Sequence, residues 1–399
     1  MKISIFDIIS MILLILPVFA CLYYWLLALY TFTFKSENKK VYNEPVHSFA
    51  IVIPAHNEET VISKTLESCL KLDYPSDKFN IYVIADNCTD HTAMIVNQYG
   101  VNCYERHNDI KIGKGFALSW AFERILPEEH DCFLIIDADC TVEPHALRVF
   151  DQYFQGGDCA LQANDVSSNP DDSPMSYAVA VGNVIENDLF YAPKSKLGLS
   201  VFLRGTGMVF HRDTLLQFPW TAHSVAEDVE YTLNLIRHDV KIQFVQNVKV
   251  RSAFPATPEQ LNVQRTRWAS GNLSFAKKQT LKLLIEGVVQ RNIMLMDAGC
   301  TFLVLSRPLV ISASFLACVA SYANWLSSGS LFSAVCLGSA VTTLFCLIAY
   351  FSLGIIILGI TWNRLNLLLL TPFVVFRLIV ISIINLIGVK GLSWKKTPR

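Results

Sequence analysis

Charged residues are scarce in this sequence of 399 residues. They make up 17% of the chain, against about 25% in an ordinary soluble domain, while 52% of the residues are hydrophobic. The formal net charge is −1, which leaves no excess of positive charge for a broad nucleic-acid-binding surface. The composition therefore argues against a wholly soluble protein and against a nucleic-acid partner, and it indicates a membrane protein.

Several common site patterns are also missing. The eleven cysteines include no CxxC pair and no cysteine–histidine spacing typical of a metal site, so we expect all of them to be reduced. No GxGxxG sequence follows the first expected strand, and GxxxxGK[ST] occurs nowhere. These absences argue against a dinucleotide-binding site and against a P-loop.

The N-terminal region is an apolar run in which Asp7 is the only charged residue between positions 3 and 34. The run exceeds the roughly 20 residues that a spanning helix needs. A cleaved signal peptide is the alternative, but its apolar stretch would be shorter and would end at a small-residue cleavage site. One lysine precedes the run and three follow it by position 40, so the positive-inside rule predicts that the globular domain is cytoplasmic.

Two further spans are expected near the C-terminus, over residues 308–326 and 331–361. The loop between them, residues 324–330, carries no charge and should lie outside the cell. Arg307 and Arg364 would then anchor the cytoplasmic ends of the two helices.

Residues 365–389 are apolar as well, but Pro372, Arg377 and Asn385 interrupt them. A complete crossing would place the basic tail, residues 390–399, outside the cell, against the positive-inside rule. We therefore expect an in-plane or re-entrant segment. Arg377 is interpreted as an arginine that extends to the membrane interface, with a buried functional residue as the alternative.

Residues 273–296 have apolar positions at helical spacing beside Lys277, Lys278, Lys282 and Arg291. This pattern predicts a helix on the inner leaflet of the membrane. An ordinary surface helix of the globular domain explains it equally well.

Between the membrane segments, short apolar strands alternate with helical patterns. Strands are expected at 49–53, 80–85 and 132–136, with helices at 58–71 and 113–126. This alternation predicts an α/β domain with a mainly parallel sheet covered on both faces. In such sheets, ligands bind beyond the carboxyl ends of the strands.

Polar residues follow each of these strands, and the pair Asp137 and Asp139 is the strongest local signal. Two positions apart on an extended chain, their side chains point the same way. Paired carboxylates suit a hard divalent cation that can bridge to phosphate oxygens. A DxD sequence is common by chance, but its place directly after a buried strand strengthens the prediction of a metal site.

Glu227 and Asp228 open another helical pattern, which runs to Arg237. The functional interpretation is a general base, which needs a fixed carboxylate near the reacting hydroxyl. Acidic residues in a first helical turn often only complement the helix dipole, and without further context that interpretation is favoured.

Gln264, Arg267 and Trp268 stand at i, i+3 and i+4 of a helical stretch and so share one face. An amide, a guanidinium and an indole on one face suit a phosphate and a flat sugar ring. The alternative is that the arginine and the tryptophan anchor the helix at the membrane interface.

Seven motifs in order resemble glycosyltransferase family 2, most closely its membrane-embedded branch of cellulose, hyaluronan, chitin and poly-N-acetylglucosamine synthases. Each motif is weak alone, but the ordered set with a matching membrane layout is specific, and the resemblance covers about residues 48–270. The motifs are PAHNEE (54–59), ADNCTD (85–90), GKGFAL (113–118), DAD (137–139), GTGMVF (205–210), ED (227–228) and QRTRW (264–268).

The resemblance implies a Rossmann-like nucleotide-sugar domain of the GT-A type and inverting transfer from a UDP-sugar. By this resemblance, Asp139 would bind Mg²⁺ or Mn²⁺, Asp228 would be the catalytic base and Glu227 would stand beside it. The substrate-binding residues would be Pro54, His56, Asn57, Glu58 and Asp86 around uridine, Lys114 near the diphosphate, Asp137 on the nucleotide sugar, and Gln264, Arg267 and Trp268 over the diphosphate and the acceptor end. The sequence departs from many relatives at Ala85, where they have an acidic residue, and at Ala226, where they have threonine.

The resemblance further implies an integral protein of the plasma or inner membrane that extends a polysaccharide. A single transfer to a lipid acceptor is the alternative, because membrane members of the family with that role also carry a Gln/Arg-Trp motif. Membrane lipids, a homo-oligomer or a secretion partner are possible partners, while the sugar and the linkage are not encoded in any motif. The expected domains are residues 1–40 (first span and basic flank), 41–270 (cytoplasmic glycosyltransferase domain), 271–306 (interface helix region) and 307–399 (C-terminal spans, in-plane segment and tail).

Overall fold

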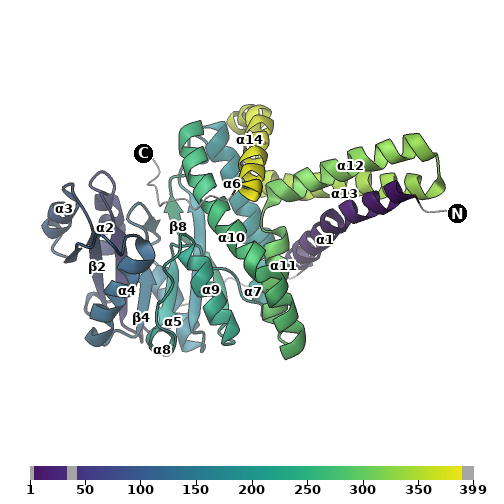
Figure 1. Cartoon of the computed structure of the whole chain (residues 1–399). Helices are drawn as coiled ribbons and strands as arrows, with labels where there is room; N and C mark the ends of the chain where they lie inside the picture. Colours follow the sequence, from purple (N-terminus) through teal and green to yellow (C-terminus); the bar gives the residue numbers. More distant parts are fainter. Residues whose placement is uncertain (1–3, 34–42, 389–399) are drawn as a thin grey trace. The chain divides into compact units, whose positions relative to one another are not determined.

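The protein is known here from a computed structural model, which describes residues 4–33 and 43–388. The chain forms two compact units. The sheet unit comprises Ser36–Asn169 and Lys194–Phe254, and the helical unit comprises Met1–Lys35, Pro170–Pro193 and Pro255–Arg399. Residues 170–193 thus belong to the helical unit, although the sheet unit contains the chain on both sides of them (Figure 1).

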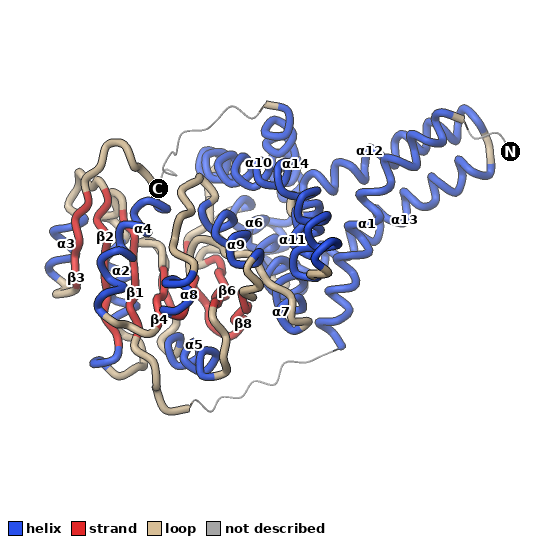
Figure 2. The backbone as a smooth tube through the Cα atoms, turned by 60° about the horizontal axis from the view of Figure 1, so that its bottom comes forward, coloured by secondary structure: helices blue, strands red, loops and turns tan. Residues whose placement is uncertain are grey.

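The sheet unit contains an eight-stranded sheet, shown in red in Figure 2, with the strand order β3-β2-β1-β4-β7-β6-β8-β5. The strands β3, β2, β1 and β4 are mutually parallel, as the sequence predicts for β1, β2 and β4, whereas β3 was not expected. The other half is mixed, because β7 runs antiparallel to both β4 and β6 while β6 and β8 are parallel. The strands are β1 (Phe49–Ala55), β2 (Phe79–Asp86), β3 (Asn102–Arg106), β4 (Cys132–Ile135), β5 (Thr141–Val142), β6 (Ala160–Ser167), β7 (Met208–His211) and β8 (Ile242–Ser252).

Helices cover both faces of the sheet, which explains why β1 and β4 are apolar at every position. On one face, Phe49 and Ile51 of β1 belong to a buried cluster with Leu66 of α2. On the other face, Phe133 of β4 packs edge-on against Phe122 of α4, with ring centroids 5.9 Å apart. The helices of this unit are α2 (Ile62–Leu70), η1 (Ser76–Lys78), α3 (Thr92–Gln98), α4 (Lys114–Ile125), η2 (Leu126–Glu128), α5 (Ala146–Gln155), α8 (Arg212–Gln217) and α9 (Glu227–Arg237).

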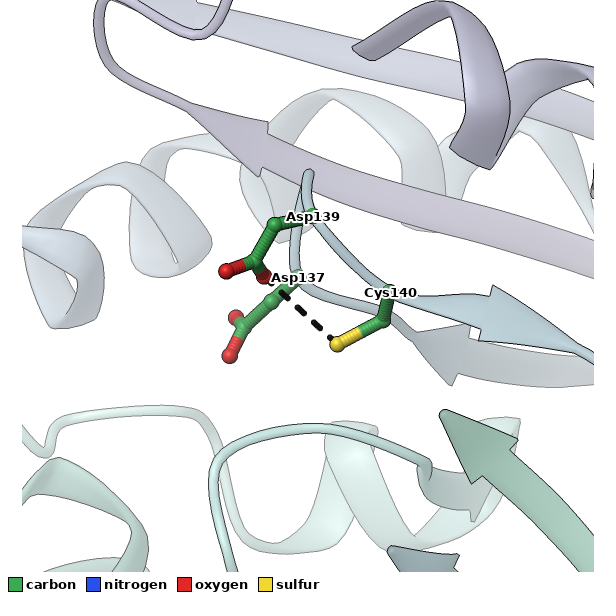
Figure 3. Close-up of side chains that lie close together, drawn as sticks. All are labelled: Asp137, Asp139 and Cys140. Atoms are coloured by element: carbon green, nitrogen blue, oxygen red, sulfur yellow. Dashed lines mark hydrogen bonds between the residues drawn. The ribbon is translucent and has the colours of Figure 1, made fainter. Parts of the chain in front are cut away.

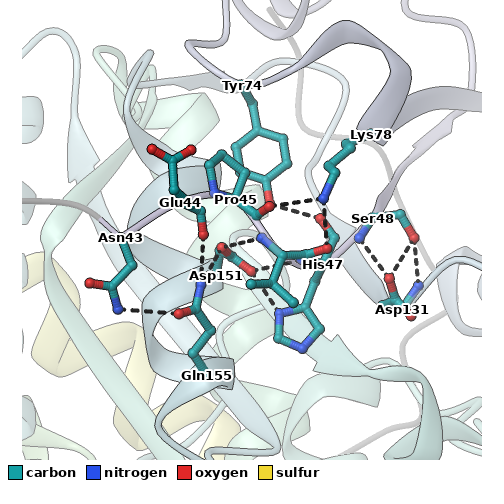
Figure 4. A network of polar contacts seen from close by, with 11 residues as sticks. Asn43, Glu44, Pro45, His47, Ser48, Tyr74, Lys78, Asp131, Asp151 and Gln155 are labelled. Carbon is teal, nitrogen blue, oxygen red and sulfur yellow. Dashed lines mark hydrogen bonds and ion pairs between the residues drawn. The ribbon is translucent and has the colours of Figure 1, made fainter.

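A polar network fixes the segment that leads into β1 (Figure 4). Asp151 of α5 is 1% exposed, and its carboxylate accepts hydrogen bonds from the backbone N–H groups of Val46 and His47, each at 3.0 Å. The Lys78 ammonium donates to the Pro45 carbonyl at 2.8 Å. Because these contacts hold the backbone on both sides of residue 46, they set where the first strand begins.

Among its described residues, the helical unit has four helices that are long and apolar enough to cross a membrane. They are α1 (Ile5–Thr33), α12 (Arg307–Ser328), α13 (Leu331–Leu358) and α14 (Trp362–Ile387), and they correspond to the four apolar segments found in the sequence. The remaining helices of the unit are α6 (Pro174–Glu186), the π-helix η3 (Asn187–Tyr191), α10 (Pro258–Gln290) and α11 (Ile293–Val304), and α7 (Ala192–Lys196) continues into the sheet unit.

Helices α1, α12 and α13 pack against one another, with Leu14, Ala317 and Ala340 in a shared buried cluster. Helix α14 packs instead on α6, α10 and α12, and it runs across the direction of the other three apolar helices (Figures 1 and 2). It is continuous through Pro372, so it lacks the break of a re-entrant loop, and its in-plane position stays a prediction. The basic residues expected at 35–40 and 390–399 lie outside the described residues.

Helix α6 is tied to the C-terminal helices of the same unit. Arg307 donates to the Gly182 carbonyl at 2.6 Å and to the Glu186 carboxylate at 3.1 Å. Arg364 forms a two-pronged pair with Asp171, at 2.6 and 3.0 Å. The expected cytoplasmic anchors Arg307 and Arg364 therefore also hold the inserted segment 170–193.

Candidate active site

Four chain segments meet beyond the carboxyl end of β4, and three of them bring charged groups there. Asp137 and Asp139 follow that strand, Lys114 is the first residue of α4, and Glu227 and Asp228 are the first two residues of α9. The fourth segment is the loop 205–207, which leads into β7. The sheet thus gathers residues that are about 110 positions apart in the sequence.

Lys114 is the cation at the centre of this site. Its Nζ atom contacts Asp137 Oδ1, donates to the Gly205 carbonyl at 2.7 Å and lies 3.9 Å from Glu227 Oε1. Burial by itself lowers the pKa of Lys114, but the carboxylates of Asp137 and Glu227 outweigh it and raise the pKa to about 12. Lys114 is therefore protonated at neutral pH and offers a fixed positive charge.

Glycine is required at position 205 because of its backbone conformation, although the site has room for a methyl group there. Its φ angle is +81°, in the region that L-residues with a side chain rarely adopt. A methyl group there would lie 3.4 Å from Lys114 Nζ and 3.7 Å from Asp228 Oδ2. The backbone of residue 205 therefore lies next to both charged groups.

Glu227 and Asp228 are half-buried carboxyls at the start of a helix. Burial, with the neighbouring Asp228 charge, raises the pKa of Glu227 to about 8. Burial also raises the pKa of Asp228, against the opposing effect of the Val229 N–H, which donates to Asp228 Oδ1 at 2.8 Å. Asp228 is therefore a better proton acceptor than an exposed aspartate, which favours the general-base interpretation over simple complementation of the helix dipole.

Asp137, Asp139 and Cys140 form a group that can hold a metal ion (Figure 3). One ligand atom from each lies within 4.8 Å of the others. The two carboxylates fit the oxygen ligands of Mg²⁺ or Mn²⁺. Sequence reasoning found both aspartates but not the cysteine, although it directly follows Asp139.

The residues expected around uridine gather at the carboxyl ends of β1 and β2. Asp86 is buried and forms an ion pair with Arg106 of β3, which the sequence analysis missed. Burial raises the pKa of Asp86, partly offset by the Arg106 guanidinium. The β2–β3 register places Asp86 directly opposite Arg106, so the pair follows from a strand that the sequence did not reveal.

Residues at and after the carboxyl end of β2 also make contacts with residues 54–58. A ring nitrogen of His56 lies 2.7 Å from the Asp86 carbonyl, and the Asn57 side chain accepts from the Thr89 N–H at 2.7 Å. The Glu58 N–H donates to the Thr92 hydroxyl at 2.8 Å. Pro54 lies within β1 itself, paired with β2.

Gln264, Arg267 and Trp268 lie together on α10, which belongs to the helical unit. The Trp268 side chain is 38% exposed, and the Arg265 guanidinium carbon stands 4.9 Å from the centre of its ring. In the same unit, Arg377 of α14 donates to the Asn262 side chain at 2.7 Å. Arg377 is thus held against the helix that carries the QxxRW residues.

The chain belongs to glycosyltransferase family 2, because the family model described as "Glycosyltransferase like family 2" matches residues 45–271. It is 27% identical over 233 residues to the beta-monoglucosyldiacylglycerol synthase of Synechocystis, covering 57% of this chain and 48% of that protein. It is 23% identical over 273 residues to the poly-beta-1,6-N-acetyl-D-glucosamine synthase of Staphylococcus epidermidis, covering 65% and 64%. The chain thus spans about half to two thirds of these relatives.

A solved structure supports the fold over nearly the whole chain. The mannosyltransferase PcManGT from Pyrobaculum calidifontis, in complex with GDP-Man and Mn²⁺, matches with a TM-score of 0.59 and 18% identity. The match covers 96% of this chain and 99% of that one. The predicted GT-A-like domain with N- and C-terminal apolar helices is therefore confirmed.

Proposed function

We propose that this protein is a membrane-bound inverting glycosyltransferase that moves a sugar from a UDP-sugar onto a growing polysaccharide, with its sheet unit in the cytoplasm. The observation that carries the proposal is the convergence of the half-buried Asp228 carboxylate, the Lys114 ammonium and the Asp137–Asp139 pair at one sheet edge. A base, a fixed cation and a metal-binding pair are what transfer from a nucleoside diphosphate sugar requires.

In the proposed reaction, Asp228 removes the proton from an acceptor hydroxyl. The acceptor oxygen bonds to the anomeric carbon as the bond from that carbon to the UDP oxygen breaks on the opposite side, so the configuration inverts. Asp139 and Asp137 would hold Mg²⁺ or Mn²⁺, which when bound neutralises charge on the diphosphate. Lys114 would contact the diphosphate. Glu227 would stand beside the catalytic base Asp228.

The other residues would bind the two substrates. Residues 54–58 and Asp86 would line the uridine pocket. The α10 face with Gln264, Arg267 and Trp268 would cover the diphosphate and the acceptor end. Membrane lipids would surround the apolar helices, and a homo-oligomer or a secretion partner would complete a polymer channel.

Transfer of one sugar to a lipid acceptor is the second candidate. It is favoured by the similarity to a beta-monoglucosyldiacylglycerol synthase, which is 27% identical over 233 residues. In that case the apolar helices would form a docking surface for the acceptor lipid instead of a polymer path.

The test is label incorporation by membrane-embedded protein from a panel of radiolabelled UDP-sugars. Labelled product in a high-mass aqueous or insoluble fraction would support the polymer, and label in the organic phase would support the glycolipid. Asp228→Asn should bind UDP as the wild type does while transfer falls about 100- to 10,000-fold, because the general base is lost. Glu230→Gln changes the same charge on the same helix and should retain activity. An active Asp228→Asn enzyme would contradict the assignment.

A further inference from the structure

Cys140 belongs to the group that can hold a metal ion, but the proposed reaction gives its sulfur no role. The residue is 1% exposed. Its thiol donates to Asp139 Oδ1 at 3.6 Å, and the Thr206 hydroxyl donates to the sulfur at 3.4 Å. Figure 3 shows the sulfur on the same side of the loop as the oxygens of both aspartates.

The spacing of these ligand atoms suits one small ion. Zinc binds sulfur at about 2.3 Å and carboxylate oxygen at about 2.0–2.2 Å, so tetrahedral ligands around it stand roughly 3.5 Å apart. The sulfur-to-oxygen distance of 3.6 Å between Cys140 and Asp139 is close to that value. Lys114 contacts only Oδ1 of Asp137, which leaves the second oxygen of that carboxylate for an ion.

One contact of the sulfur supports a thiolate once a metal is bound, against burial and the neighbouring carboxylates of Asp139 and Asp137, which raise the pKa of the free Cys140 thiol. The Asp137 N–H donates to Thr206 Oγ1 at 3.1 Å, which orients the hydroxyl so that its own hydrogen points to Cys140. A hydrogen bond from outside the ligand set stabilises a metal-bound thiolate. If Cys140 were only a small apolar residue, its sulfur would need neither the hydroxyl nor the carboxylate.

We propose that Cys140 is a third metal ligand beside Asp137 and Asp139, and that it makes this site bind thiophilic divalent ions such as Zn²⁺ more tightly than two carboxylates can. This inference rests on the proposed function only in taking the aspartate pair as the metal site. Binding forms a metal–sulfur bond and releases the thiol proton to solvent, while Mg²⁺ uses the oxygen ligands alone. Zn²⁺ then competes with the metal that supports transfer, and zinc inhibition becomes a built-in property of the site.

The test uses the full-length protein in lipid nanodiscs, with Co²⁺ as a spectroscopic substitute for Zn²⁺. Wild-type protein should show a sulfur-to-cobalt charge-transfer band in the near ultraviolet. Cys140→Ser should lack the band, bind Zn²⁺ at least tenfold more weakly and bind Mg²⁺ within twofold of the wild type. Cys159→Ser removes an exposed cysteine of the same unit and should behave as the wild type.

A wild-type protein without the band, or a Cys140→Ser protein that keeps it, overturns the inference. Cys140→Ala serves as a second variant if serine disturbs folding, and thermal unfolding verifies that each variant is folded. Asp139→Ala separates the two proposals. If Asp139→Ala loses Mn²⁺-dependent UDP binding while Cys140→Ser changes nothing, the cysteine inference fails and the proposed function stands. If Asp139→Ala binds Mn²⁺ and UDP unchanged, the aspartate metal site itself is wrong.

Discussion

At the scale of single residues, the ammonium group of Lys114 opposes the effects that raise the pKa values of the neighbouring carboxyl groups. Four carboxyl groups, those of Asp137, Asp139, Glu227 and Asp228, lie near one half-buried ammonium group. Lys114 lowers the pKa values of Glu227 and Asp228, whereas burial and the neighbouring carboxylates raise them. The proton affinity of the base is therefore set by the balance between this one cation and its surroundings.

This balance predicts the pH dependence of transfer. Asp228 must be deprotonated to accept a proton, and its pKa is raised above the ordinary value of 3.8, so activity should fall as the pH is lowered through that raised pKa. Lys114→Met removes a charge that lowers the pKa, so the acid limb of log kcat/KM should move to higher pH. The measurement is the pH profile of kcat/KM for both proteins.

Lys111→Met is the matched control, because Lys111 is an exposed lysine in the same connection between β3 and α4. Its acid limb should coincide with that of the wild type. A Lys114→Met profile that does not shift, or that shifts to lower pH, would contradict the electrostatic account.

At the scale of elements, the strands that were predictable are the buried ones. β1 and β4 are continuous apolar runs, β2 is apolar from Ile81 to Ala85, and the polar residues that follow these runs carry the nucleotide and metal motifs. β3 has the sequence Asn-Cys-Tyr-Glu-Arg, which has no apolar run, so neither the strand nor the Asp86–Arg106 pair could be found. The antiparallel β7 was also missed, since strand direction depends on long-range pairing that no local pattern encodes.

The segment leading into β1 offers a stability prediction at this scale. Asp151→Ala removes the buried carboxylate that binds the backbone of residues 46 and 47, leaving those N–H groups without that acceptor. We expect a loss of about 3 kcal/mol in the free energy of unfolding, as for other broken buried polar contacts. The measurement is the thermal unfolding midpoint of the full chain in detergent.

The control is Asp73→Ala, which breaks the pair with Arg148 on a largely exposed side chain. An exposed pair contributes at most about 1 kcal/mol, so this variant should unfold close to the wild type. Equal destabilisation by the two substitutions would show that the network around Asp151 does not hold the first strand in place.

At the scale of the whole molecule, the expected orientation in the membrane is testable with a native cysteine. Cys159 is exposed in the sheet unit, while the other cysteines are buried or half-buried. If the sheet unit is cytoplasmic, a membrane-impermeant maleimide should label Cys159 only after cells are permeabilised. Ser327→Cys, at the exposed end of α12, should be labelled in intact cells, because the α12–α13 loop is expected outside.

The Cys159→Ser protein shows which label belongs to that residue. Labelling of Cys159 in intact cells would reverse the proposed orientation and place the site on the outer side of the membrane.

The inserted segment 170–193 affects how this protein folds during synthesis and how it can be truncated. Translation produces this segment after β6 and well before the helices that carry Arg307 and Arg364, so its acidic residues Asp171 and Glu186 have no ionic partners until most of the chain has left the ribosome. A fragment that ends near residue 255 would keep this segment but lose Arg307 and Arg364, and we expect such a fragment to aggregate. A short hydrophilic linker in place of residues 170–193 would be the first step towards a fragment suited to crystallisation.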